Sequence, residues 1–114
     1  MATNIARRAA TETLRSRAFG SISGTYAVLG TALLNPARIL VWQNLTDKTV
    51  FISDDGINDK FVLPGSGYFV LDLTANASED GYFYEQGTQF YVKDGGVATT
   101  MGAVYLSVCY GRII

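Results

Sequence analysis

Short apolar stretches separated by turn residues dominate the chain from Gly20 onward. The stretches are rich in Val, Tyr, Phe and Thr, which favour pleated strands. They are bounded by turn residues such as Asn35-Pro36 and Pro64-Gly65. The pattern predicts about seven strands, over residues 25–33, 38–44, 49–53, 60–63, 68–73, 88–93 and 103–111. Short strands at this spacing predict a mainly β fold, a single jelly-roll-like β-sandwich of antiparallel strands.

Alternation assigns two faces to the last predicted strand. One face is formed by apolar residues, Val104, Leu106, Val108 and Tyr110. The opposite face is formed by Tyr105, Ser107 and Cys109. Because both faces are fairly apolar, the strand is either central in its sheet or covered on one face by a partner. We expect Val104, Leu106 and Val108 to be core, and the face with Cys109 to be covered by a partner or partly by water.

The N-terminal residues follow a different pattern. Residues 4–18 are mostly good helix formers, which predicts a helix. Ile5 and Leu14 are nine residues apart and so lie on opposite faces at about 100° per residue. A helix held on two sides by neighbouring subunits fits this arrangement, and so does a weak helix with a few exposed apolar residues. We therefore divide the chain into an N-terminal α-helical arm, 1–20, and a β-sandwich domain, 21–114.

Charge separates the same two parts of the chain. The first 20 residues carry four arginines and one glutamate, a net charge of +3, whereas the remainder carries −4. A basic arm on an acidic body can dock on an acidic neighbour, including a second copy of the chain. Packaged DNA is a further candidate contact for the arm, and an arginine-rich arm is also typical of a mitochondrial transit peptide. The predicted partner-interface residues are Ile5, Arg7, Arg8, Leu14, Arg15 and Arg17.

Two loops could be taken for a calcium site and a phosphate-binding site, but the sequences of both fit turns better. In the stretch DDGIND, residues 54–59, the positions that an EF-hand loop would use before Gly56 include Phe51, so the ligand pattern fails. The stretch LPGSG lacks the lysine and the following Ser or Thr of a phosphate-binding loop. Pro64 and Gly65 suit the central positions of a type II turn. We predict hairpin corners at both places and no metal site.

The composition disfavours most enzyme classes. The chain contains no histidine and one cysteine, Cys109, so Ser-His-Asp and Cys-His nucleophile pairs and zinc clusters are excluded. Two alternatives stay open. A glycosidase could use the carboxylates Glu79, Asp80 and Glu85. A carbohydrate-binding sandwich could use Trp42, or Tyr82, Phe83 and Tyr84, as a sugar platform. We expect no catalytic residues, no cofactor and no membrane span, since no apolar stretch is long enough to cross a bilayer.

Three phrases of the β region fall in order between Asn44 and Gly111: NLTDKTVFISDDGINDKFVLPGSGYFVLDLTAN, EQGTQFYVKDG and GAVYLSVCYG. Together they resemble small virion structural proteins of tailed bacteriophages. The resemblance implies a β-sandwich building block of the head-to-tail neck, the tail or the capsid surface, with no catalytic residues. A homo-oligomeric ring or adaptor at the neck is the expectation, and a capsid decoration or cement protein is the nearest rival. The implied partners are copies of the chain and other virion proteins (portal, tail or capsid). The implied location is the virion, assembled in the bacterial host cytoplasm.

Overall fold

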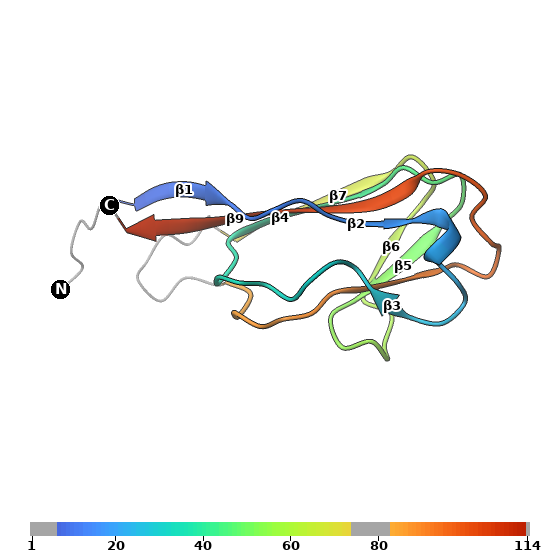
Figure 1. Cartoon of the computed structure of the whole chain (residues 1–114), viewed down its shortest axis with the longest axis horizontal. Helices are drawn as coiled ribbons and strands as arrows, with labels where there is room; N and C mark the ends of the chain where they lie inside the picture. The colour runs from blue at the N-terminus through green and yellow to red at the C-terminus, as the bar shows by residue number, and fades with distance from the viewer. Residues whose placement is uncertain (1–6, 74–82, 114) are drawn as a thin grey trace.

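The computed structural model describes residues 7–73 and 83–113, and these residues are mainly β. Helical structure in the described residues is limited to one 3₁₀ turn, η1, at Phe19–Ser21. The strands are β1 Arg7–Thr11, β2 Arg15–Ala18, β3 Ala27–Val28, β4 Ile39–Asn44, β5 Val50–Ser53, β6 Phe61–Leu63, β7 Tyr68–Asp72, β8 Tyr91–Asp94 and β9 Ala103–Ile113 (Figure 1). No helix among these residues has the length and hydropathy needed to span a membrane.

The strands form two antiparallel sheets. Sheet A has the order β1-β9-β4-β7, with β2 also paired to β9, and sheet B has the order β3-β8-β5-β6. The chain passes from sheet A to sheet B between β4 and β5, and it returns between β6 and β7 (Figure 1). Strand β9 pairs with β1 and β2 on one side and with β4 on the other, which confirms that the last strand is central in its sheet.

The two sheets bury their facing side chains in one core. Strands β4 and β9 of sheet A contribute Leu40, Trp42, Val104, Leu106 and Val108, and sheet B contributes Val50, Ile52, Leu63 and Val92. Trp42 is fully buried. Its ring lies 5.0–5.8 Å from three phenylalanine rings, those of Phe61, Phe69 and Phe90, which come from both sides of the core. Such aromatic contacts add to the area that they bury.

Each of the predicted β segments contains a strand, but the first is much shorter than expected. Within residues 25–33 only Ala27–Val28 is a strand, although Leu29 and Leu33 still donate backbone hydrogen bonds to Phe90 and Thr88. Gly30 interrupts the ladder with a φ of +70°. A Cβ at Gly30 would lie 2.5 Å from the Cβ of Arg15, so the bend makes room for that side chain.

The predicted helix over residues 4–18 is wrong for residues 7–18. These residues form β1 and β2, which pair with the long strand β9. Tertiary pairing has overridden local helix propensity, because an unpaired edge of β9 would leave its peptide groups without partners. Residues 1–6 lie outside the described part of the chain. The boundary at residue 20 stays a prediction, but residues 7–18 are hydrogen-bonded into the sheet of the main body.

The turn between β6 and β7 lies one residue later than predicted. The Gly67 N–H donates to the Pro64 carbonyl at 2.9 Å, so Gly65 and Ser66 are the central residues. Ser66, with a φ of +63°, takes the position that a type II turn usually gives to glycine. A Cβ at Gly65 would lie 3.0 Å from the Asp47 carbonyl carbon. Gly65 is therefore needed for close approach of two loops and not for an unusual φ.

Candidate interaction surface

The face of sheet A that points away from the core carries an apolar stripe. We call this face the outer face. The stripe consists of Thr11, Leu14, Ile39, Val41, Tyr68, Val70, Tyr105, Ser107 and Cys109, and the exposed Gln43 lies on the same face between Tyr68 and Tyr105. The register places Val41 opposite both Val70 and Ser107. Tyr68 and Val70 are 71% and 48% exposed, so the stripe reaches solvent at its β7 end. Apolar side chains gathered on an exposed sheet face are typical of a protein contact site.

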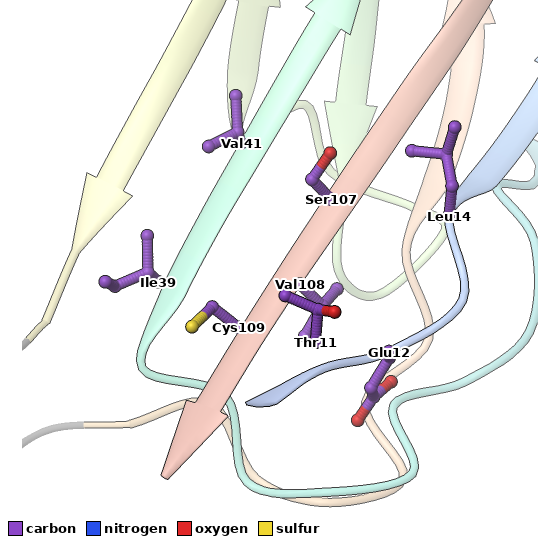
Figure 2. Close-up of a pocket in the computed structure, with 8 residues that line it drawn as sticks. All are labelled: Thr11, Glu12, Leu14, Ile39, Val41, Ser107, Val108 and Cys109. Atoms are coloured by element: carbon purple, nitrogen blue, oxygen red, sulfur yellow. The ribbon is translucent and has the colours of Figure 1, made fainter. Parts of the chain in front are cut away.

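A pocket of about 280 Å³ lies on the outer face, where the strand pairing of sheet A is interrupted. Figure 2 shows its lining side chains, which come from β4, β9 and the link between β1 and β2: Thr11, Glu12, Leu14, Ile39, Val41, Ser107, Val108 and Cys109. The interruption is a β-bulge. Thr11 pairs with Cys109 and Arg15 pairs with Leu106, so residues 12–14 face only two residues of β9.

The bulge turns Arg15 toward the protein interior. Arg15 pairs with buried Leu106, and its side chain is only 4% exposed. The guanidinium donates to the carboxylate of Glu12 at 2.6 Å and to the carbonyls of Thr31 and Ala32 at 2.7 and 2.9 Å. A buried guanidinium needs this many acceptors to offset its lost hydration. Arg15 therefore fastens the bulge to the loop before β4.

Glu12 completes this buried ion pair. Its side chain is 2% exposed, and it also accepts hydrogen bonds from the Asn35 side chain at 3.0 Å and the Leu34 N–H at 3.3 Å. Burial alone would raise the pKa of Glu12, but the hydrogen bonds from Asn35, Arg15 and Leu34 outweigh it and hold the pKa below its ordinary value. Glu12 is thus a charged structural group, and its pKa shift is opposite to that of a general acid.

The residues that were predicted to form a partner interface lie in different environments. Ile5 lies outside the described residues, and Arg7 and Arg8 belong to β1. Leu14 is 54% exposed at the pocket, which is the exposure that a contact residue needs. The predicted interface role of Arg15 is corrected to an internal one, because its own chain surrounds the side chain. The guanidinium of Arg17 donates to the carbonyls of Ser21 and Val28 at 2.8 and 3.1 Å.

The aspartates of the DDGIND stretch build a turn, as predicted. One oxygen of Asp55 accepts from the Ser53 hydroxyl and from the N–H groups of Ile57 and Asn58 at 2.7–2.8 Å. The hydrogen bonds from Asn58, Ile57 and Ser53 lower the pKa of Asp55 well below its ordinary value. This carboxylate caps its own backbone.

Lysines neutralise the other two aspartates of this turn. Lys60 lies 3.3 Å from Asp54, and Lys93 lies 3.2 Å from Asp59. Tyr26 also donates a hydrogen bond to Asp59. Among the residues that the structure describes, no three side chains of the His, Cys, Asp or Glu type are grouped as metal ligands. The absence of a cation site stays a prediction that calcium titration can test.

The structure does not support the alternative sugar platform at Trp42. Trp42 is completely buried and cannot meet a ligand. Tyr84 packs on the core with its ring 5.2 Å from that of Phe90, whereas Phe83 is exposed. Glu85 is exposed. The other candidates of both alternatives, Glu79, Asp80 and Tyr82, lie outside the described residues.

Most of the outer face was not predicted from the sequence. Alternation along β9 indicated Tyr105, Ser107 and Cys109, whereas Ile39, Val41, Tyr68 and Val70 were not predicted to belong to the same surface. The signal was available, because RILVWQN and YFVLDL each contain four consecutive apolar residues, ILVW and YFVL. Such a strand has both faces buried, or buries one face and presents the other to a partner. Only the strand order shows that these strands are neighbours.

A scan against family models, a search of curated proteins and a search of solved structures found no match to this chain.

Proposed function

We propose that the protein is a homo-oligomeric structural component of a tailed-bacteriophage virion, a ring or adaptor at the head-to-tail connector. The order of the three phrases between Asn44 and Gly111 supports the assignment to a virion. The observation that carries self-association is the apolar outer face of sheet A, with Tyr68, Val70 and Leu14 exposed. The jelly-roll-like sandwich belongs to the same proposal, and the core shared by two antiparallel sheets supports it.

Association through the outer face fits the chemistry of that surface. Its pocket contains one acidic group, Glu12, whose carboxylate is held by Arg15 and Asn35. The remaining lining is apolar or carries hydroxyl and thiol groups, which suits contact with another apolar surface more than turnover of a substrate. A role of the N-terminal arm in contacting DNA would depend on Arg7 and Arg8, since Arg15 and Arg17 donate to their own chain.

Copy number in purified particles tests the proposal most directly. Quantitative mass spectrometry of intact virions is expected to find the chain at a low copy number, similar to that of the portal. A particle map should place it between the head and the tail. Absence of the chain from purified virions would overturn the proposal.

A capsid decoration or cement protein is the second candidate, because the same apolar face could bind a capsid shell. It predicts a copy number that scales with the major capsid protein, and loss of the chain would weaken the shell without blocking tail attachment. The same mass-spectrometric measurement separates the two candidates.

A further inference from the structure

The loop between β5 and β6 presents one apolar side chain to solvent. Ile57 is 79% exposed, the highest exposure among the large apolar side chains that the structure describes. The loop around it is braced from within, because the Asp55 carboxylate accepts hydrogen bonds from the N–H groups of Ile57 and Asn58 and from the Asn58 side chain at 2.8–2.9 Å. A side chain on a preorganised loop loses little conformational entropy when a partner buries it. Ile57 is therefore suited to enter a pocket on another molecule.

The surroundings of Ile57 are acidic. The three aspartates of the DDGIND stretch belong to the same loop, and two lysines, Lys60 and Lys93, form ion pairs with them. Three carboxylates against two ammonium groups leave this surface with a net negative charge. A partner surface that receives Ile57 should therefore combine an apolar centre with a basic border.

The pocket on the outer face has the size and the lining to receive such a side chain (Figure 2). Its volume is about 280 Å³, and a cavity of about 150 Å³ is large enough to hold benzene. Leu14, Ile39 and Val41 supply apolar contacts, and all of the lining residues belong to the described part of the chain. Leu14 is 54% exposed, so the mouth of the pocket is open to solvent.

The end of sheet A next to this pocket is basic. Strand β1 contributes Arg7 and Arg8, and β9 contributes Arg112, to a ladder of five residue pairs that contains no acidic residue. The last pair of the ladder, Thr11 with Cys109, lines the pocket. The arginine-rich ladder thus adjoins the pocket along the strands. This arrangement complements the apolar tip and the acidic surroundings of the β5–β6 loop.

The loop and the pocket of one chain cannot meet. The loop extends from sheet B, and the pocket lies on the face of sheet A that points away from sheet B (Figure 1). A contact between them must therefore join two molecules through two different surfaces. Such a heterologous contact repeats from copy to copy, and it closes into a ring where the rotation permits.

We propose that Ile57 of one copy occupies the outer-face pocket of a second copy. The acidic loop would then lie beside the arginine-rich ladder of β1 and β9. The inference rests on the self-association in the proposed function and assigns it to two surfaces. Because each copy offers one loop and one pocket, the contact would build a ring or a filament from copies of a single chain.

A matched pair of lysine variants tests the loop. Ile57 and Val62 are exposed apolar residues of the same β5–β6 hairpin, with 79% and 58% exposure, so neither substitution should disturb folding. Ile57→Lys removes the apolar tip and brings a positive charge to a basic border. We expect sedimentation to show concentration-dependent association for the wild type and for Val62→Lys. For Ile57→Lys we expect the dissociation constant to rise about tenfold or more, the change that ~1.4 kcal/mol produces.

Mixing two variants tests whether the contact joins a loop to a pocket. Ser107→Phe would fill the pocket and keep Ile57, whereas Ile57→Lys keeps the pocket. Each variant alone should be monomeric. An equal mixture should form a dimer and nothing larger, because one working loop and one working pocket remain. A mixture that stays monomeric, while circular dichroism melts show both variants folded, would overturn the pairing of loop with pocket.

The single cysteine of the chain allows a cross-link without any change in the pocket. Cys109 lines the pocket, so Ile57→Cys should form a disulfide with Cys109 of the partner subunit on mild oxidation. Because every copy then carries both thiols, a non-reducing gel should show a ladder of multimers. Val62→Cys is the control and should give no ladder, and adding Cys109→Ser to Ile57→Cys should abolish it.

The outcomes distinguish this inference from the proposed function. A wild-type oligomer that is unchanged by Ile57→Lys, with no ladder from Ile57→Cys, would overturn the assignment to loop and pocket and leave self-association standing. A wild-type chain that stays monomeric at every concentration tested would overturn the second copy as the occupant. Either result is independent of whether the chain is found in purified particles, which tests the proposed function.

Discussion

The two faces of sheet A have similar hydropathy in the sequence and opposite environments in the structure. On strand β9, Val104 and Leu106 are fully buried against sheet B, whereas Ser107 and Cys109 on the outer face are only partly covered. The same alternation continues across β4 and β7. The inner face is closed by sheet B of the same chain, and the outer face is only partly covered by the described residues. Inner-face changes should therefore cost folding stability, and outer-face changes should alter association first.

Among inner-face substitutions, replacement of Arg15 should cause the largest loss of folding stability. Replacing it by Met would remove the cationic partner of Glu12 and leave a buried carboxylate that is held only by hydrogen bonds from Asn35 and Leu34. Such a loss costs roughly 3–5 kcal/mol. Urea denaturation followed by circular dichroism would measure this loss. The double variant Arg15→Met with Glu12→Gln should recover part of it, because no buried charge then remains. A loss under about 1 kcal/mol for Arg15→Met alone would mean that the ion pair contributes as little as a surface pair does.

Substitutions at Leu106 and Cys109 compare the two faces of strand β9. Leu106→Ala leaves a cavity in the shared core and should lower the free energy of unfolding by roughly 2–5 kcal/mol. Cys109→Ser, on the outer face, should cost less than about 1 kcal/mol and should change the oligomeric state before it changes folding. Equal destabilisation in urea melts, with unchanged size in solution, would mean that both faces are buried within one subunit.

Acid should weaken the attachment of the bulge to the inner face. The pKa of Glu12 is lower in the folded chain than its ordinary value of 4.5, so its contribution to stability is present above that pH. It is lost as the pH falls through the lowered pKa. Asp47, Asp55 and Asp59 also have lowered pKa values and share this acid dependence.

Glu12→Gln isolates the contribution of one carboxylate to this pH dependence. Melting temperatures measured from pH 7 to pH 3 should fall less steeply for Glu12→Gln than for the wild type. The variant should be the less stable of the two at neutral pH, and the gap should narrow as the pH falls. Parallel curves over this range would show that Glu12 is equally easy to protonate in the folded and unfolded chains.

The β elements were predictable because their signals are local. Alternation and turn residues located the strands from β3 to β9, and the sides of β9 followed from period two alone. The N-terminal strands were missed for a physical reason. Residues 7–18 prefer helix locally, and only pairing with β9, about a hundred residues away in sequence, makes them strands.

The candidate surface was predictable only in part. The apolar outer face of β9 was visible in the sequence, whereas its continuation over β4 and β7 depends on strand order. The internal role of Arg15 was hidden, because it arises from a one-residue bulge that reverses the face of β2 relative to β1. A sequence pattern of four arginines indicates a basic arm, and it carries no information on which of them will be buried.

A valine-to-threonine pair gives the smallest expected effect and the finest comparison of the two faces. The substitution keeps the side-chain shape and adds one hydroxyl, which needs a hydrogen-bond partner where it is buried. At Val41 on the outer face, the hydroxyl can reach solvent or the neighbouring Ser107, so the free energy of unfolding should change by no more than about 0.5 kcal/mol. At Val104, which is fully buried, the same change should cost roughly 1–3 kcal/mol. Urea denaturation of both variants measures the difference. Similar losses of unfolding free energy at Val41 and Val104 would show that water is excluded from the outer face as completely as from the core.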